Sequence, residues 1–470
     1  MARLSRFCWL DFLLLVLVLG VAAGVRAGYL VTCADGGRSA GPLLVQDPLS
    51  PLPGLPAGTE MRGRKDPTEL DALFHNVKEH LWFGSLAPFA PAEEATAHVA
   101  PGYPWLLGLI GRLIEPDVDY LVRWIQVGLG ALTAGLYFLF ARRAFRSLFV
   151  GSLAGLLAAG YPFWILNTAT IDDGVLATFL LAAVVFLGAR AVQTSGPFAS
   201  LLYGLALAGL ALVRAALVPF AFVALAWFLL RSRHVPRGWL CALVAFLGFA
   251  TGVAPWSLRN FRRFNEPVPV ASSAHLHLWI GNNPRATGGP ATEDILEIAP
   301  AGELLAIENQ PARYARLGRE WWRTVHEQPL STVQRRFWAA QYFLFGERWF
   351  KQQQLAEETG QPGGREKMPP RLASSYAPLL LLSLLGLFLF AFLGWRWTYA
   401  WAAEAMPSAL AVLWVPLPYL LSHAEALHGP RLPLDGVLLC YAAFAVACLI
   451  PGIGGRLLQG ATEGRGDEEG

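Results

Sequence analysis

Residues 174–192 read GVLATFLLAAVVFLGARAV and carry a single charged side chain, that of Arg190. A helix needs about 20 consecutive apolar residues to cross a bilayer, so this stretch is typical of a membrane-spanning helix. Similar blocks recur along the chain, without the alternation in segments of roughly ten residues that marks a membrane barrel. Only 15% of the 470 residues are charged, whereas a soluble domain has about 25%. The sequence therefore predicts an all-α integral membrane protein.

About ten transmembrane helices are expected from these blocks. The first block follows Arg3 and Arg6, and a cleaved signal peptide ending near Val25-Arg26-Ala27 is the alternative interpretation. Residues 198–230 are too long for one crossing and are interpreted as two short ones that break at Arg214. The candidate spans are residues 9–30, 120–141, 149–167, 174–192, 198–214, 215–230, 239–256, 376–394, 405–421 and 433–450.

Two long polar segments interrupt the apolar blocks. The first contains a helix expected over residues 66–83 and another over 103–114, which is too short to cross. The second carries a Trp- and Arg-rich stretch over 312–354, which either lies flat at the membrane interface or forms a small soluble cap. The predicted parts are the first transmembrane helix (1–30), a first extracytoplasmic loop (31–118), transmembrane helices (119–256), a second extracytoplasmic loop (257–375), C-terminal transmembrane helices (376–452) and a disordered cytoplasmic tail (453–470).

Positive charges in the short loops set the expected orientation. Arginines concentrate at residues 142–146 and 231–237, and loops of this kind stay in the cytoplasm. If the first helix starts in the cytoplasm, both long loops and the pair Asp172-Asp173 face the opposite side. We therefore expect a multi-pass protein of the plasma or inner membrane, with its active site on the extracytoplasmic side.

Several classes of function find no support in the sequence. The net charge is +3 and no basic stripe with interleaved aromatic residues is present, which argues against nucleic-acid binding. The five cysteines form no CxxC pair, so no metal site is expected, although carboxylates and a phosphate can together hold a divalent cation. Residues 279–289 lack the Gly-Lys-Ser/Thr ending of a nucleotide-binding loop. Asn282 and Asn283 in this loop either bind sugar hydroxyls or belong to a plain turn.

Acidic residues at helix boundaries are candidates for a general base, the group that takes a proton from an attacking hydroxyl. Asp66 precedes Pro67, so helix capping explains it as well as catalysis does. Asp172 and Asp173 lie between two apolar spans. They either cap the next helix or supply acidic groups that face the first loop.

Three arginines and one histidine are candidates for binding a phosphate. Arg214 lies within an apolar stretch, where a charge is costly and indicates function unless the side chain reaches the interface. Arg259 and Arg431 lie at span ends and suit either bidentate phosphate contacts or interfacial anchoring. His98 is either a donor to phosphate or hydroxyl groups or a structural histidine.

Short motifs follow one another in a characteristic order: DPTELDAL at 66–73, HVAPGYP at 98–104, GLALAGLALVR at 204–214, PWSLRN at 255–260, GNNP at 281–284 and RLP at 431–433. From about Trp9 to Ile450, this arrangement resembles the GT-C superfamily of polyprenyl-phosphate-sugar-dependent glycosyltransferases, close to protein O-mannosyltransferases and lipid A aminoarabinose transferases. Three positions depart from the family pattern. Pro67 replaces a residue that is often acidic, Leu70 the usual aromatic residue, and Ala100 the first proline of a Pro-Pro pair.

The resemblance implies an inverting transfer of a sugar at the outer leaflet. The implied partners are a polyprenyl-phosphate sugar donor, a lipid, glycan or protein acceptor, and membrane lipids. The implied general base is Asp66, with Asp173 or Asp172 as a second acidic residue. The implied donor-phosphate residues are His98, Arg259, Arg431 and Arg214, and the implied substrate-loop residues are Tyr103, Asn260, Asn282 and Asn283.

A polytopic lipid or solute transporter is the alternative function. It would use Arg214 and the Asp172-Asp173 pair along an internal pathway. Transporters often consist of repeated halves with interrupted helices, and this sequence shows no internal repeat. A non-catalytic scaffold or sensor is a third reading, and it would not need acids and arginines that converge on one face.

The expected topology can be tested by cysteine labelling in intact membranes. Single cysteines introduced at residues 66 and 282 should both react with a membrane-impermeant thiol reagent from the non-cytoplasmic side, because both long loops are placed there. A cysteine at residue 143 is the matched cytoplasmic control. Reaction of residues 66 and 282 from opposite sides would contradict the topology.

Overall fold

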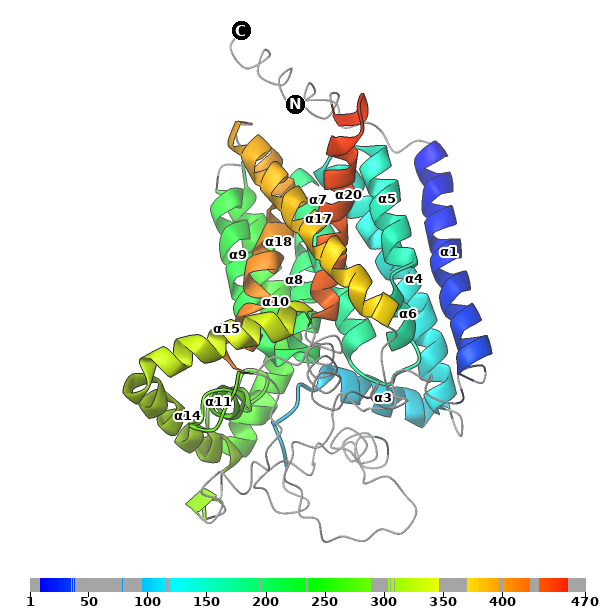
Figure 1. Ribbon diagram of the computed structural model, residues 1–470. Helices are drawn as coiled ribbons and strands as arrows, with labels where there is room; N and C mark the ends of the chain where they lie inside the picture. The colour runs from blue at the N-terminus through cyan, green and yellow to red at the C-terminus, as the bar shows by residue number, and fades with distance from the viewer. Residues whose placement is uncertain are drawn as a thin grey trace, which may run out of the picture.

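The structure of the protein is a computed structural model (Figure 1). The described residues form helices joined by loops, which confirms the all-α class. Asp66 and the helix expected over 66–83 lie outside the described residues except for Lys78, and so does the tail after residue 454. The structure describes residues 9–34, 95–114, 118–194, 196–233, 236–288, 303–345 without 305 and 308, 370–396, 400–422 and 431–454, together with residues 36, 38 and 78.

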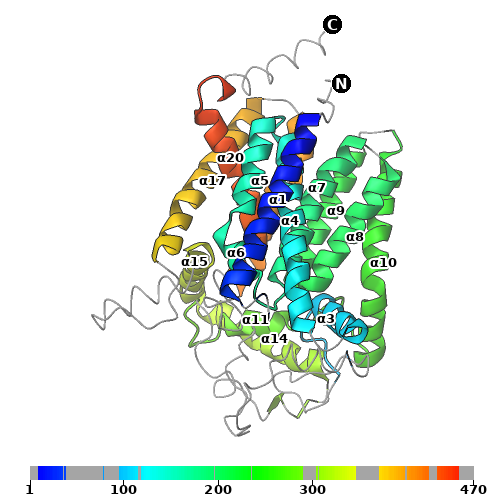
Figure 2. The same ribbon diagram turned by 90° about the vertical axis from the view of Figure 1, so that its right-hand side faces the viewer.

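Seven helices among the described residues are long and apolar enough to cross a membrane, which fits a multi-pass membrane protein. In both views of the bundle, the first residues of α1 and the last residues of α20 lie at the same end (Figures 1 and 2). The seven are α1 (Trp9–Cys33), α4 (Val118–Ala144), α7 (Gly174–Thr194), η2 (Ala215–Leu217) with α9 (Val218–Ser232), α10 (Gly238–Phe264), α18 (Ala400–Trp414) with α19 (Leu417–Leu421), and α20 (Leu432–Leu449).

Three further apolar helices are shorter: α5 (Leu148–Ala159), α8 (Pro197–Val213) and the 378–391 part of α17 (Pro370–Arg396). The prediction of one continuous helix over 149–167 is wrong. Helix α5 ends at Ala159, and α6 (Pro162–Asn167) begins after a two-residue break. Proline disfavours helical backbone in the residue before it and suits the first turn of a new helix, which explains the break. The predicted break at Arg214 agrees with the structure, because Arg214 has extended backbone between α8 and η2.

Four helices lie across one end of the bundle, the end opposite to the start of α1 (Figures 1 and 2). We call it the capped end. The four are α3 (Gly102–Leu113), α11 (Ala274–Ile280), α14 (Gln310–Glu327) and α15 (Pro329–Phe345). Helix α3 runs roughly across the bundle axis in both views, and its 12 residues are too few to span a bilayer.

Helix α20 occupies the centre of the bundle and packs against α4, α5, α7, α17 and α18. Nearly all of its residues are buried, as expected of a helix that is apolar on every side. Small residues bring other helices into backbone contact, as is common in membranes. A methyl group added at Gly204 of α8 would lie 1.9 Å from the carbonyl oxygen of Ala245 in α10. The α8–α10 pair therefore depends on glycine at this position.

Replacing Gly204 by alanine should destabilise the protein by about 1–3 kcal/mol, the usual cost of overpacking. The backbone of α10 must move, since a carbonyl cannot rotate away as a side chain can. Gly128→Ala in α4 is the matched control, because a methyl group there meets nothing within 4 Å. Thermal unfolding in detergent should show a lower melting temperature for Gly204→Ala only. Equal melting temperatures would refute the close contact.

Candidate functional site

A bidentate ion pair joins the break at Arg214 to the loop before α7. The Arg214 Nη2 atom lies 2.7 Å from Oδ1 of Asp173, and its Nε atom lies 2.8 Å from Oδ2. The guanidinium is buried, whereas the carboxylate is 32% exposed. This geometry is the strongest form of an arginine–carboxylate contact. The pair lies at the capped end, where Gly102 of α3 packs against Leu212.

Asp172, the neighbour of Asp173, is buried and points to different partners. Asn167 Nδ2 donates to both carboxylate oxygens at 2.9 and 2.8 Å, and the Gly174 N–H donates to Oδ1 at 2.7 Å. Burial, and next the charge of Asp173, raise the pKa of Asp172 to about 7, although these hydrogen bonds and Arg214 act in the opposite direction. One carboxyl group of the adjacent pair is therefore poised to exchange a proton near neutral pH.

Tyr103 of α3 lies close to both carboxylates. Its hydroxyl donates to Gln126 Oε1 at 3.3 Å, and Gln126 Nε2 donates to the carbonyls of Thr168 and Thr170 at 2.9 Å each. Burial is the main cause that raises the pKa of Tyr103, followed by the charges of Asp172 and Asp173. Tyr103 therefore stays protonated, and Gln126 ties α3 and α4 to the loop that carries the acidic pair.

Tyr419 of α19 completes the cluster. The Arg214 guanidinium donates a hydrogen bond to its hydroxyl. On its other side, the Tyr419 ring stacks on Phe343 of α15, with ring centroids 5.9 Å apart. We call Tyr103, Asp172, Asp173, Arg214 and Tyr419 the acidic cluster.

Two side chains from the capped end fix the position of α19. Arg336 of α15 donates to the carbonyls of Leu420 (2.7 Å) and Ser422 (2.5 Å). Asn282 Nδ2 donates to the carbonyl of Leu421 at 3.0 Å. Three consecutive carbonyls that a helix end leaves without partners are thus satisfied. Asn282, predicted as a substrate-loop residue, acts in the structure as an anchor for the helix that carries Tyr419.

Asn283 and the pair Arg259–Asn260 have backbone partners. Asn283 Nδ2 donates to the Ile280 carbonyl at 3.0 Å within its own turn. Asn260 Nδ2 donates to the carbonyls of Val268 and Val270 at 3.1 and 3.2 Å. Arg259 donates to the Thr96 carbonyl at 2.8 Å and stacks on Trp256. These contacts hold the segment before α3 against α10, and none of the three is placed in the acidic cluster.

His98 lies in the same segment and is buried. Its Nδ1 atom is 2.9 Å from the Tyr314 hydroxyl of α14, and its ring lies near that of His277. Burial lowers the pKa of His98 to about 4, so the imidazole is neutral near pH 7. A neutral ring can donate a hydrogen bond to a phosphate but cannot balance its charge.

Arg431 forms a second buried ion pair, at the start of α20. Its Nε atom lies 3.1 Å from Asp435 Oδ1, and the Tyr161 hydroxyl donates to Asp435 Oδ2 at 2.7 Å. Both charged side chains are fully buried. Helix α6 follows Tyr161 and ends at Asn167, the partner of Asp172, so one short helix connects the second ion pair to the acidic cluster.

The structure thus brings four predicted site residues together, Tyr103, Asp172, Asp173 and Arg214, and places the other described ones around them at the capped end. Sequence reasoning missed Tyr419 and Asn167. Tyr419 follows Pro416-Leu417-Pro418, a signal for an interrupted span that would have drawn attention to it. The described residues contain no group of three His, Cys, Asp or Glu side chains that could hold a metal ion.

Comparison with known protein-family models and with curated protein sequences finds no match to this chain.

The raised pKa of Asp172 predicts a specific pH dependence of stability. A carboxyl group whose pKa is higher in the folded than in the unfolded protein stabilises below its unfolded pKa of 3.8, and this contribution is lost as the pH rises to about 7. Asn at position 172 does not titrate. Relative to wild type, Asp172→Asn should therefore gain stability from pH 5 to pH 8, at about 1.4 kcal/mol per pH unit below 7.

Melting temperatures of both proteins in detergent at pH 5, 6, 7 and 8 measure this difference. Glu327→Gln on α14 is the control, because its side chain is largely exposed. A constant offset between wild type and Asp172→Asn across this range would contradict the raised pKa.

Proposed function

We propose that the chain is a membrane glycosyltransferase of the inverting type. It transfers a sugar from a polyprenyl-phosphate-linked donor to a hydroxyl of a lipid, glycan or protein. The sequence resemblance to the GT-C superfamily suggests this reaction, and the acidic cluster supports it. The observation that carries the proposal is the partly exposed Asp173 carboxylate, paired with the buried Arg214 beside a second, titrating carboxyl group.

The reaction needs a carboxylate and a cation at one place. A carboxylate removes the proton of the acceptor hydroxyl, whose oxygen attacks the anomeric carbon while the bond to the phosphate oxygen breaks. The polyprenyl phosphate leaves with that electron pair, and a cation stabilises the charge that it gains. We assign the base to Asp66 and the phosphate contact to Arg214, and we assign Arg431, buried with Asp435, to positioning the start of α20. Asp173 keeps Arg214 oriented in a water-poor setting, where such charges interact more strongly than in water.

Ten crossings and an extracytoplasmic active site are part of the same proposal. The three shorter apolar helices add to the seven long ones, and the arginine-rich loops lie at the end away from the cap. Helix α15 supports a membrane-surface position for the cap. Its inner face is fixed by Arg336, whereas Leu330, Val333 and Phe337 on its outer face are all more than half exposed. Such an apolar row suits the headgroup region of a bilayer.

Replacing either Asp66 or Asp173 should abolish the sugar transfer that the protein performs. Mass spectrometry of envelope lipids and glycans should show one sugar-bearing product in cells with wild-type protein. Asp66→Asn and Asp173→Asn should lack it at unchanged expression, because the base or the oriented arginine is lost. Glu69→Gln, three residues from Asp66, is the matched control and should keep the product.

Identical products in cells with and without the protein would refute a transferase. Movement of an unmodified lipid or solute across the membrane would instead favour the transporter.

A further inference from the structure

Arg26 lies inside the first apolar helix and is fully buried. Its guanidinium meets the C-terminal end of α5, where the chain breaks. Nη1 donates to the carbonyls of Ala22 and Ala159 at 3.0 Å each, and Nη2 donates to that of Ala158 at 3.3 Å. Inside a membrane, the last carbonyls of a helix have no water to bond. The C-terminal end of the helix dipole also carries a partial negative charge. Arg26 therefore supplies the hydrogen bonds that the last carbonyls of α5 would otherwise lack.

Two N–H donors of Arg26 are left over, one on Nη2 and one on Nε. The Nε atom is buried and has no hydrogen-bond partner among the residues that the structure describes. A buried donor without a partner costs free energy, and more so in a membrane than in water. No carboxylate of the described residues pairs with this guanidinium, unlike those of Arg214 and Arg431. The buried Nε–H group therefore needs an acceptor, and the space beside it decides which acceptor fits.

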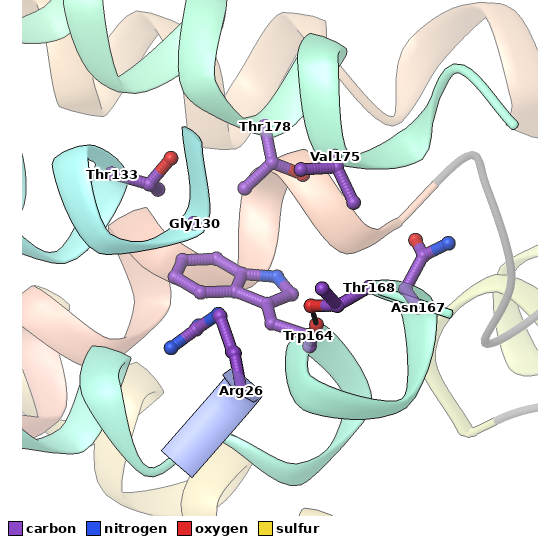
Figure 3. A pocket seen from close by; sticks show the side chains of 8 residues that line it. All are labelled: Arg26, Gly130, Thr133, Trp164, Asn167, Thr168, Val175 and Thr178. Atoms are coloured by element: carbon purple, nitrogen blue, oxygen red, sulfur yellow. Dashed lines mark hydrogen bonds between the residues drawn. The ribbon is translucent and has the colours of Figure 1, made fainter. Parts of the chain in front are cut away.

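A small cavity adjoins the side chain (Figure 3). It has about 10 Å³ for the centre of a water-sized sphere, which is room for one water molecule and far too little for a sugar or a phosphate. The close-up shows the Trp164 indole between Arg26 on one side and Thr178 on the other. The lining side chains come from α1, α4, α6 and α7 and the residue after α6: Arg26, Gly130, Thr133, Trp164, Asn167, Thr168, Val175 and Thr178.

Three threonines give the cavity its hydrogen-bonding character. The hydroxyls of Thr133, Thr168 and Thr178 each donate to the carbonyl four residues earlier, at 2.7, 2.9 and 2.7 Å. Each donor is thereby used, and each oxygen keeps lone pairs that accept. Asn167 Oδ1 is a further buried acceptor without a partner among the described residues. The cavity thus presents the Nε donor and several acceptors.

We propose that this cavity binds one ordered water molecule. The water accepts a hydrogen bond from Arg26 Nε and donates its two protons to acceptors of the lining. A buried water usually makes two to four hydrogen bonds. A phosphate is too large for this space, and a cation is repelled by Arg26. The water supplies a hydrogen bond that Arg26 lacks at the α5 break, and it links α1 to α4, α6 and α7. This role does not depend on the proposed sugar transfer.

A high-resolution structure of the wild-type protein in lipid nanodiscs tests the site directly. The expected result is one density peak within hydrogen-bonding distance of Arg26 Nε. An empty cavity would overturn the proposal. So would a halide, identified by anomalous scattering in crystals that contain bromide. Because this measurement uses the unaltered chain, it does not depend on any variant folding.

Thr133→Val gives a second measurement, since valine keeps the shape and removes an acceptor one turn from Gly130, against which Arg26 Nε packs. Thr251→Val on α10 is the matched control. Thr251 also donates to the carbonyl four residues earlier, at 2.8 Å, but it is exposed on the outside of the bundle. We expect the melting temperature of Thr133→Val to fall by roughly 2 °C more than that of Thr251→Val. Equal falls in melting temperature for the two variants, with unchanged density in the cavity, would contradict the bound water.

Discussion

Hydrocarbon offers no water to the unpaired backbone groups of an interrupted helix. At each interruption in this bundle, side chains must therefore supply the missing hydrogen bonds. At two helix ends, arginine supplies these hydrogen bonds. Arg26 meets the carbonyls at the end of α5, and Arg336 those at the end of α19. Arg214 lies at the break after α8 and is held by Asp173. The polar chemistry of the described bundle follows from this constraint, because a break brings backbone and charged groups into an apolar setting.

The same breaks create the acidic cluster. Extended backbone at Arg214 turns a guanidinium towards the loop before α7, and the end of α6 presents Asn167 to Asp172. The short helix α19, which begins after Pro416, places Tyr419 beside Arg214. Helices α6 and α19 are only one or two turns long, and the position of α19 depends on Arg336 and Asn282 in the cap. The capped end is therefore part of the construction of the site as well as its cover.

Much of the fold could be predicted from sequence, because length and hydropathy are local properties. The break at Arg214 was visible for the same reason: a charge interrupts an apolar run of 33 residues. The break at Gly160 was missed because the run stays apolar across it, although Pro162 in the sequence indicates it. The pairing of Arg214 with Asp173 required knowing which helices are neighbours, and so did the roles of Asn282 and Tyr419. Asp66 lies outside the described residues, so its place relative to the acidic cluster stays a prediction.

The central position of α20 has a consequence for biogenesis. This helix follows α4, α5, α7, α17 and α18 in the chain, and it fills the space between them. During synthesis, the earlier helices enter the membrane before their common partner exists. Until α20 is inserted, Tyr161 lacks its partner Asp435, and Phe163 lacks its partner Arg431. The earlier helices must therefore remain loosely associated. Assembly is then completed by a late helix that carries a ready-made ion pair into the middle of the bundle.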